Sequence, residues 1–173
     1  MRVNKIVWVM GESAVGKATF IRYALANPGC TLMRQLGYHD GKIIPVIENN
    51  DRSKIKNIVL DLLDKEKDAI VLIKWQAADS IYPQGDGLLK TLAAETPDTP
   101  REIILLSAES DVLYARAQRK PWWNKPDIPY SYYTQERQDE NTERTKSHAK
   151  ELSTLGFKLV EIDSTDGYRF LSN

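Results

Sequence analysis

The sequence predicts an α/β fold, a three-layer α/β/α arrangement built on a five-stranded, mainly parallel sheet. Two observations carry this prediction. Short, almost continuously apolar runs alternate with segments whose apolar residues recur at helical spacing along the 173 residues, which is typical of a parallel sheet covered by helices on both faces. The first apolar run leads through a glycine-rich loop into a helical segment, and this is the first half of a β-α-β unit.

Length and composition indicate a single domain over residues 1–173, long enough to bury a full hydrophobic core. The 24 Lys and Arg residues balance 24 Asp and Glu residues, so no long-range field attracts nucleic acid or an anionic membrane. The single cysteine, Cys30, suits a reducing compartment, and no apolar stretch reaches the length of a membrane span. We therefore expect a cytoplasmic protein that binds neither nucleic acid nor membrane; a homodimer is left open.

The strongest motif follows the first predicted strand. A glycine, four residues and a second glycine followed by lysine form the spacing of a phosphate-binding loop. Glycines allow the backbone angles at which successive N–H groups converge on an anion, the next helix adds the positive end of its dipole, and the lysine adds a full charge. The predicted ATP-binding residues are Gly11, Glu12, Ser13, Ala14, Val15, Gly16, Lys17, Ala18 and Thr19.

The residue after the lysine departs from the motif. A Ser or Thr is expected there, because its hydroxyl binds Mg²⁺, but the residue is Ala18. Thr19 stands one position further, and one step along a helix turns a side chain by about 100°. Thr19 is the remaining candidate for a metal ligand in the loop, but it does not simply replace the missing hydroxyl.

The other elements follow from periodicity and turn signals. Pro45 cannot donate to a sheet ladder, so the segment 43–47 is predicted to be an edge strand or an extended loop. Residues 135–146 are almost all polar, and this half of the last helix is expected to project into solvent or over a cleft. The predicted strands are 5–10, 30–36, 69–73, 102–106 and 157–162, and the predicted helices are 20–25, 53–67, 88–93, 111–120 and a long helix through 155.

A polar cluster that includes Glu48, Asp51 and Arg52 is a candidate for binding an acceptor substrate. It follows the segment 43–47, and ligands of parallel-sheet proteins gather beyond the carboxyl ends of the strands. A solvated loop that caps the next helix is an equally good interpretation of the same residues.

The end of the predicted strand 69–73 supplies two further candidates. Many phosphate-loop enzymes carry a metal-holding aspartate at this strand end, but here the sequence continues with Lys74. Trp75 is a candidate for stacking on a ligand, although core packing is the commoner role of a tryptophan. Asp79 is a candidate for orienting the acceptor or turning back to a metal, although helix capping is the commoner role.

Residues 121–133 differ in character from the rest of the chain. Three prolines, Pro121, Pro126 and Pro129, argue against a helix or a central strand, and five aromatic residues lie among them. We predict a lid-like segment over residues 116–137. The stretch 124–127 also fits the N-K-x-D guanine motif of GTPases, but the chain holds no D-x-x-G triplet to accompany it, and we interpret the match as coincidence.

With this loop and at this size, the chain resembles the P-loop nucleoside and nucleotide kinases and their small-metabolite kinase relatives. Residues 111–119 look like the helix that enters the lid of those enzymes, and residues 141–165 look like their last helix and strand with the loop that borders the nucleotide base. The resemblance implies ATP and Mg²⁺ as cofactors. It also implies that Arg116 and Arg119 touch nucleotide phosphates or base and that Arg137 is a further lid arginine, which suits the charge that develops in phosphoryl transfer.

The leading hypothesis is a phosphotransferase that moves the γ-phosphoryl group of ATP to a small acceptor: a nucleoside, a nucleotide or a metabolite. Lys17, Arg116, Arg119 and Arg137 are its predicted catalytic residues. The alternative is a nucleotide-binding protein with little or no kinase activity, because Ala18 and Lys74 occupy the two expected metal-ligand positions. A third hypothesis is a kinase that acts on polynucleotide ends, and the zero net charge argues against it.

Overall fold

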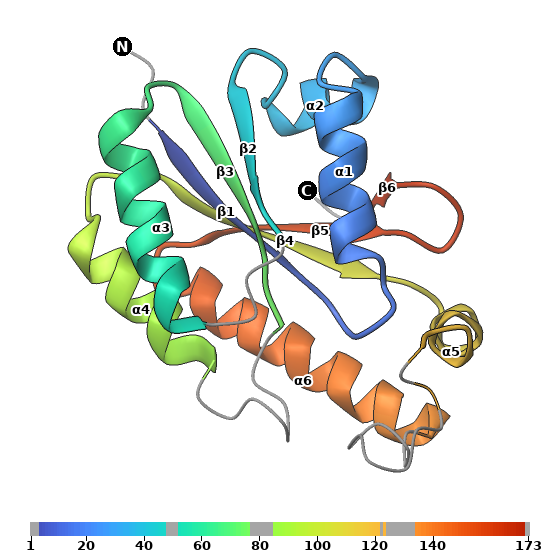
Figure 1. The fold of residues 1–173 in the computed structure, drawn as a ribbon. Coiled ribbons are helices and arrows are strands. Elements are labelled where there is room, and N and C mark those ends of the chain that lie inside the picture. The colour runs from blue at the N-terminus through green and yellow to red at the C-terminus, as the bar shows by residue number, and fades with distance from the viewer. Residues whose placement is uncertain (1–3, 48–51, 77–84, 122, 124–133, 172–173) are drawn as a thin grey trace.

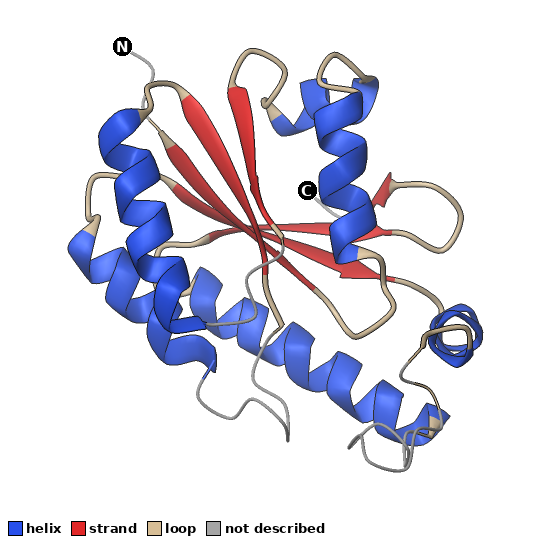
Figure 2. Ribbon diagram, viewed as in Figure 1, coloured by secondary structure: helices blue, strands red, loops and turns tan. Residues whose placement is uncertain are grey.

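In the computed structural model the chain forms one six-stranded sheet with helices on both faces (Figures 1 and 2). The structure describes residues 4–47, 52–76, 85–121, 123 and 134–171. The sheet order is β2-β3-β1-β4-β5-β6; the first five strands run parallel, and β6 runs antiparallel to β5. The strands are β1 Lys5–Met10, β2 Lys42–Val46, β3 Ala69–Lys74, β4 Arg101–Ser107, β5 Lys158–Asp163 and β6 Arg169–Phe170. The helices are α1 Lys17–Ala26, α2 Thr31–Leu36, α3 Arg52–Lys65, α4 Gly85–Glu95, α5 Ser110–Gln118 and α6 Gln135–Ser153.

Each face of the sheet carries its own hydrophobic core, which confirms the predicted three layers. Helices α3, α4 and α6 pack on one face, where Trp8 and Trp75 meet edge to face with ring centroids 5.2 Å apart. Helices α1, α2 and α5 pack on the other face, around Phe20 and Leu113. Because both faces are covered, β1, β3 and β4 are buried along most of their length. In the described part of the chain no helix is both long and apolar enough to cross a membrane.

The strand predicted over residues 30–36 is wrong, because this segment forms helix α2. Its buried residues Leu32, Met33 and Leu36 follow helical spacing. Gly37 ends the helix at φ 75°, and the Tyr38 N–H donates to the Met33 carbonyl oxygen at 2.8 Å. A glycine in this conformation is a common helix end, so the local sequence favours a short helix.

The second strand of the sheet is the segment that carries Pro45, and it lies at the edge, as one of the two interpretations predicted. The opposite edge is β6, a two-residue strand that the sequence analysis missed. It follows a turn at Gly167, where φ is 74°. The sheet therefore has six strands rather than five.

The polar first half of α6 contributes one row of side chains to the interior. Gln138, Asn141 and Thr145 share a side of the helix and are buried, and further along the same side the buried residues become Ala149 and Leu152. This buried side of α6 is therefore polar in the first half of the helix and becomes part of the hydrophobic core in the second half. In the first half, only the other sides of the helix face solvent.

A buried carboxylate of β4 contacts side chains of β1 and β5 and of the residue beyond Gly37 at the amino end of the sheet. Glu102, at the start of β4, is 4% exposed. Its Oε2 accepts a hydrogen bond from the buried Tyr38 hydroxyl, and its Oε1 accepts one from Lys5 Nζ at 2.7 Å. Lys158 Nζ lies 3.6 Å from the same Oε1. The ion pairs compensate the burial of the charge.

Tyr38 is expected to make the stability of the protein sensitive to alkaline pH. Burial, the negative charge of Glu102 and the hydrogen bond to it hold the pKa of Tyr38 well above its ordinary value of 10.0. The pKa of Tyr38 is higher in the folded protein than in the unfolded chain. The contribution of Tyr38 to the free energy of unfolding is therefore complete below pH 10. It is lost as the pH rises from 10 toward the folded pKa, because in that range only the unfolded chain releases the proton.

The prediction is that Tyr38→Phe flattens the fall of unfolding free energy above pH 10 by up to about 1.4 kcal/mol per pH unit. Urea unfolding at neutral and alkaline pH measures this slope. Tyr114→Phe, which removes one tyrosine hydroxyl elsewhere in the described chain, is the control. Equal slopes for Tyr38→Phe and the wild type would contradict the assignment.

Candidate functional site

Close backbone packing holds the loop between β1 and α1 in place. Gly11 has φ 156° and Gly16 has φ 95°, values that glycine adopts readily and other residues rarely. A Cβ on Gly11 would lie 2.7 Å from the carbonyl oxygen of Leu106 and 2.6 Å from Val15 Cγ1. The predicted loop thus connects the carboxyl end of a central strand to the amino end of α1, where the unpaired N–H groups of a first helical turn lie.

Ala14 occupies a strained position in the middle of the loop. Its φ is 67°, and among the described non-glycine residues only Asp68 shares a positive φ. The left-handed conformation costs an alanine about 1–2 kcal/mol because Cβ crowds the next carbonyl group. Such strain is typical of functional loops.

Lys17 lies at the centre of the loop and is only 6% exposed. Its Nζ donates to the carbonyl oxygens of Gly11 at 2.8 Å and Glu12 at 3.1 Å, and to Gln76 Oε1 at 3.0 Å. Gln76 follows the end of β3, so the neighbouring strand helps to hold the ammonium. The motif in the sequence indicated Lys17, but no sequence pattern indicated Gln76.

Two further polar residues at the loop are buried. Glu12 is 3% exposed, and its Oε1 accepts a hydrogen bond from the Ser13 N–H at 2.7 Å. Gln138 of α6 is fully buried, and its Nε2 lies 3.5 Å from the Ser13 carbonyl oxygen. Gln138 was also missed; the available signal was a polar row at helical spacing in α6.

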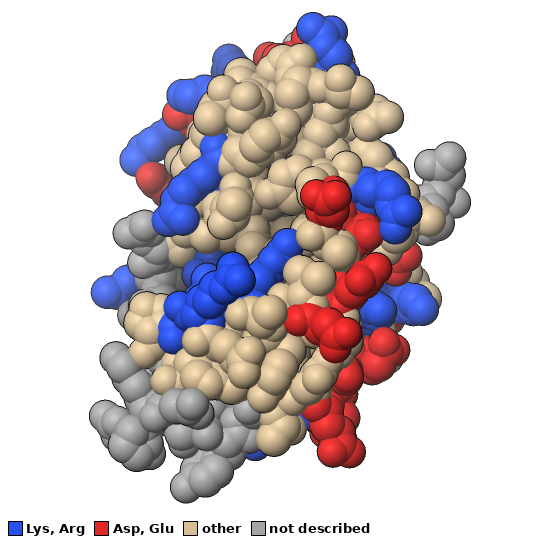
Figure 3. Space-filling view, turned by 90° about the vertical axis from the view of Figure 1, so that its right-hand side faces the viewer, with Lys and Arg blue, Asp and Glu red and all other residues tan. Residues whose placement is uncertain are grey.

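A pocket of about 480 Å³ lies beside the loop. Its lining combines the loop, the last turn of α5 and the loop after β5. The lining residues are Ala14, Val15, Gly16, Thr19, Arg116, Arg119, Lys120, Ser164, Gly167 and Tyr168. Three of them are cations and none is acidic, which suits an anionic ligand. Figure 3 looks onto this side of the molecule, where Lys and Arg side chains gather in one band and Asp and Glu side chains in another.

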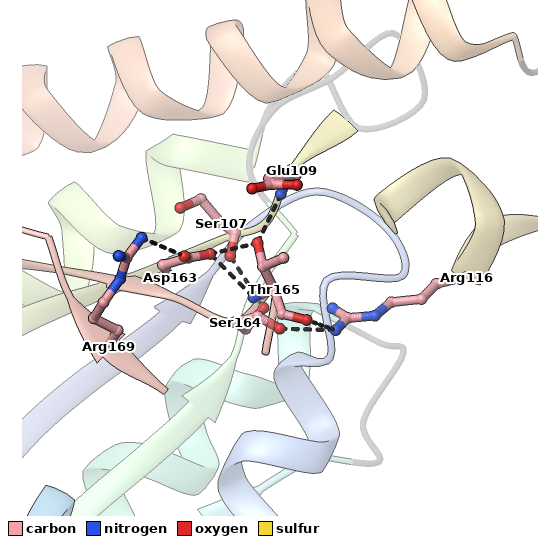
Figure 4. Close-up of polar contacts among 7 residues, drawn as sticks. All are labelled: Ser107, Glu109, Arg116, Asp163, Ser164, Thr165 and Arg169. Carbon is pink, nitrogen blue, oxygen red and sulfur yellow. Dashed lines mark hydrogen bonds and ion pairs between the residues drawn. The ribbon is translucent and has the colours of Figure 1, made fainter. Parts of the chain in front are cut away.

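The loop after β5 is bonded to α5, as Figure 4 shows, and it is also bonded to the loop between β1 and α1. Arg116 Nη2 donates to the carbonyl oxygens of Ser164 at 2.7 Å and Thr165 at 3.2 Å. The Ser164 hydroxyl lies 3.1 Å from the Val15 carbonyl oxygen and 3.0 Å from that of Ser107, so that it donates to one of them at a time. Arg116 therefore shapes the pocket wall in addition to lining it.

Asp163 stabilises the same loop from inside. Its Oδ1 accepts hydrogen bonds from the N–H and hydroxyl of Thr165, and its Oδ2 accepts one from Arg169 at 3.0 Å. The Thr165 hydroxyl oxygen in turn accepts the Glu109 N–H at 2.9 Å. Burial raises the pKa of Asp163, but the hydrogen bonds from Thr165 and Arg169 outweigh it and leave the pKa below its ordinary 3.8. These contacts persist at neutral pH.

The three predicted lid arginines are not gathered in one place. Arg116 and Arg119 both line the pocket beside the loop. Arg137 lines a separate groove of about 450 Å³ along α6, together with Thr134, Glu136, Glu140, Asn141 and Arg144. Of the predicted lid, residues 122 and 124–133, including the N-K-x-D stretch, lie outside the described residues.

The predicted acceptor-binding residues are mostly outside the described structure. Glu48, Asp51 and Asp79 are not described, and Arg52 is described only as the first residue of α3. Trp75 is 1% exposed and packs against Trp8. The structure gives Trp75 the core role rather than that of an exposed stacking platform.

The two loop residues that follow Lys17 do not supply an evident Mg²⁺ ligand. Ala18 carries no oxygen in its side chain, and Thr19 is exposed and lines the pocket beside the loop. Gln76 offers a neutral amide oxygen, and that oxygen accepts from Lys17. No group of three or more His, Cys, Asp or Glu side chains among the described residues is arranged to hold a metal.

Comparison with known proteins adds distant structural similarity only. No protein-family model and no curated protein matches the chain. Among solved structures, it is similar to a shikimate kinase from Bacteroides thetaiotaomicron, with a TM-score of 0.47 and 12% identity over 91% of this chain and 86% of that one. It is also similar to the protein APE1195, with a TM-score of 0.43 and 14% identity over 88% and 98% of the two chains. The description of the fold as three layers around a mainly parallel sheet rests on the chain's own strand order and pairing.

The strain at Ala14 predicts that Ala14→Gly stabilises the protein by about 1 kcal/mol, because glycine adopts a positive φ without the Cβ clash. Chemical denaturation measures the change in unfolding free energy. Ala115→Gly, on the exposed side of α5, is the matched control and should destabilise by about 1 kcal/mol. A destabilised Ala14→Gly would show that the conformation is not strained.

Proposed function

We propose that this protein binds ATP and transfers its γ-phosphoryl group to a small acceptor, a nucleoside, a nucleotide or a metabolite. The observation that supports this most is the loop from Gly11 to Thr19, which places Lys17 at the amino end of α1 beside a cationic pocket of about 480 Å³. A pocket of this volume is in the range of small-molecule sites. We seat the nucleotide with its phosphates at the loop and beside the cations of the pocket, and with its base and ribose in the rest of the pocket.

Each described residue then has a distinct task. Lys17 neutralises charge on the outer phosphates, and the amino end of α1 adds its dipole. Arg116 keeps the loop after β5 in position against the base, while Arg119 is exposed at the pocket and available to the phosphates. Arg137 lies in the groove along α6 and is assigned to the acceptor side. No covalent intermediate is required, because positioning and charge stabilisation provide most of the catalysis of phosphoryl transfer.

The second candidate is a nucleotide-binding protein with little or no transfer activity. It is favoured by the side chains at the two expected metal-ligand positions, the methyl group of Ala18 and the ammonium group of Lys74. Enzymes of this reaction class use Mg²⁺ to neutralise the charge that develops on the phosphates, and these residues do not supply it with ligands. Binding of nucleotide is common to both candidates, and turnover separates them.

Binding is tested first. ATP at about 100 times its dissociation constant should stabilise the wild type by roughly 2.7 kcal/mol. Lys17→Ala should lose most of this gain, because the charge facing the phosphates is gone; each variant is compared with its own melting temperature without ATP. Lys65→Ala, which removes an exposed lysine of α3, is the control and should keep the full shift. If ATP stabilises Lys17→Ala and the wild type by the same amount, the assignment of the phosphate site is wrong.

Turnover is tested with a panel of acceptors under multiple-turnover conditions, with and without Mg²⁺. The panel contains nucleosides, nucleotides, small hydroxylated metabolites and an oligonucleotide with a free 5′-hydroxyl group. A phosphorylated product that disappears with Lys17→Ala supports the kinase. ATP binding without product from any acceptor supports the second candidate.

The metal position gives a separate prediction. If the nucleotide binds together with Mg²⁺, Ala18→Ser should add a hydroxyl ligand and strengthen the dependence of ATP affinity on Mg²⁺. Calorimetric titration of ATP at several Mg²⁺ concentrations measures this dependence. Identical titrations for Ala18→Ser and wild type would show that residue 18 does not lie at the metal.

A further inference from the structure

Gln138 is buried at the site with incomplete hydrogen bonding. It is 0% exposed, and no described polar or charged residue is buried more deeply. Its Nε2 lies 3.5 Å from the Ser13 carbonyl oxygen, at the outer limit of a hydrogen bond. Its Oε1 is buried and has no hydrogen-bond partner among the described residues. A buried amide in this state destabilises a fold relative to an apolar residue of the same shape, so stability does not explain a glutamine here.

The helix turn that carries Gln138 is fixed independently of the loop. The Thr134 hydroxyl oxygen accepts the Arg137 N–H at 3.2 Å and caps α6. Gln135 Nε2 donates to Ser110 Oγ at 3.0 Å and to Asp111 Oδ1 at 2.6 Å, which fastens α6 to the start of α5. The position of Gln138 next to the loop is therefore set by contacts that do not involve the loop.

The loop is the adjustable partner in this contact. The Ser13 carbonyl group faces Gln138, while the Ser13 N–H is bonded to the Glu12 carboxylate. The next residue, Ala14, has the strained φ of 67°. Phosphate-binding loops act through their backbone N–H groups, so the orientation of the peptides at residues 13 and 14 affects how many of them an anion can reach. A carboxamide offers both a donor and an acceptor to those peptides, and an apolar side chain offers neither.

We propose that Gln138 is a positioning residue, which orients the Ser13 and Ala14 peptides and thereby sets the affinity of the loop for polyphosphate. This inference rests on the proposed function, because it requires that the loop binds phosphates. Gln138 acts through the Ser13 backbone and does not itself contact the ligand. Its effect is consequently independent of the base.

The test compares Gln138→Met, a near-isosteric apolar variant, with the wild type by calorimetric titration of two probes, ATP and inorganic tripolyphosphate. Both probes should bind about tenfold more weakly to Gln138→Met, as expected for one lost hydrogen bond. The melting temperature of the free protein should stay the same or rise, because the unsatisfied amide is removed. Thr145→Val, on the same buried side of α6, is the matched control and should bind both probes as the wild type does.

Several outcomes would overturn the proposal. Unchanged affinities for Gln138→Met would do so, and so would a loss for ATP alone, since that would place the effect at the base. Weaker binding together with a lower melting temperature would indicate a merely structural role. If Gln138→Met does not fold, Gln138→Leu replaces it: this apolar variant also offers neither a donor nor an acceptor to the Ser13 and Ala14 peptides, and it should show the same tenfold loss for both probes. Unchanged binding to Gln138→Leu would overturn the proposal in the same way.

Lys17→Ala separates this inference from the proposed function. If Lys17→Ala binds tripolyphosphate as well as the wild type does, the phosphate site itself is wrong. If Lys17→Ala loses the probe while Gln138→Met retains it, only the positioning role is wrong.

Discussion

The close approach of Gly11 to β4 is the constraint on which the site depends. A Cβ on this residue would lie 2.7 Å from the Leu106 carbonyl oxygen, so the loop can lie against the end of β4 only where residue 11 is a glycine. In this position the Val15 carbonyl oxygen comes within reach of the Ser164 hydroxyl, which also reaches the carbonyl oxygen of Ser107. The loop between β1 and α1, β4 and the loop after β5 are thus joined, and the pocket lies against this joined backbone.

The fold was predictable from the sequence wherever the residues of a single element show by themselves that the element is buried. Strands covered on both faces are apolar throughout, and β1, β3 and β4 were located for this reason. The segment 30–36 was misread because its seven residues are too few for the spacing of the apolar side chains to separate a strand from a short helix. The helix is favoured by Gly37 at its end and by Tyr38 beyond it, whose buried hydroxyl reaches Glu102. Contacts across that sequence distance leave no local pattern, and neither does a two-residue strand such as β6.

The same limit applies to the candidate site. That a loop with this glycine spacing joins a strand to a helix was predictable, because the whole pattern is contiguous in the sequence. The partner of Lys17, Gln76, is 59 positions away, and the residue that faces Ser13, Gln138, is 125 positions away. In the sequence, Gln76 and Gln138 do not differ from other polar residues, because only the folded sheet and α6 place them at the loop. The charge of Arg116 was visible in the sequence, but its two carbonyl acceptors, Ser164 and Thr165, appear only in the fold.

The contacts of Lys17 also determine what kind of ligand the loop can select. The described acceptors of Lys17 Nζ include two loop carbonyl oxygens and the amide oxygen of Gln76, which are all neutral. A phosphate oxygen that takes the place of one of these three acceptors exchanges a neutral oxygen for a charged one. Charge-assisted hydrogen bonds are about twice as strong as neutral ones, and a neutral ligand of the same shape obtains no such gain from the exchange. At this lysine, therefore, the charge of a ligand favours its binding more than its capacity for hydrogen bonds does.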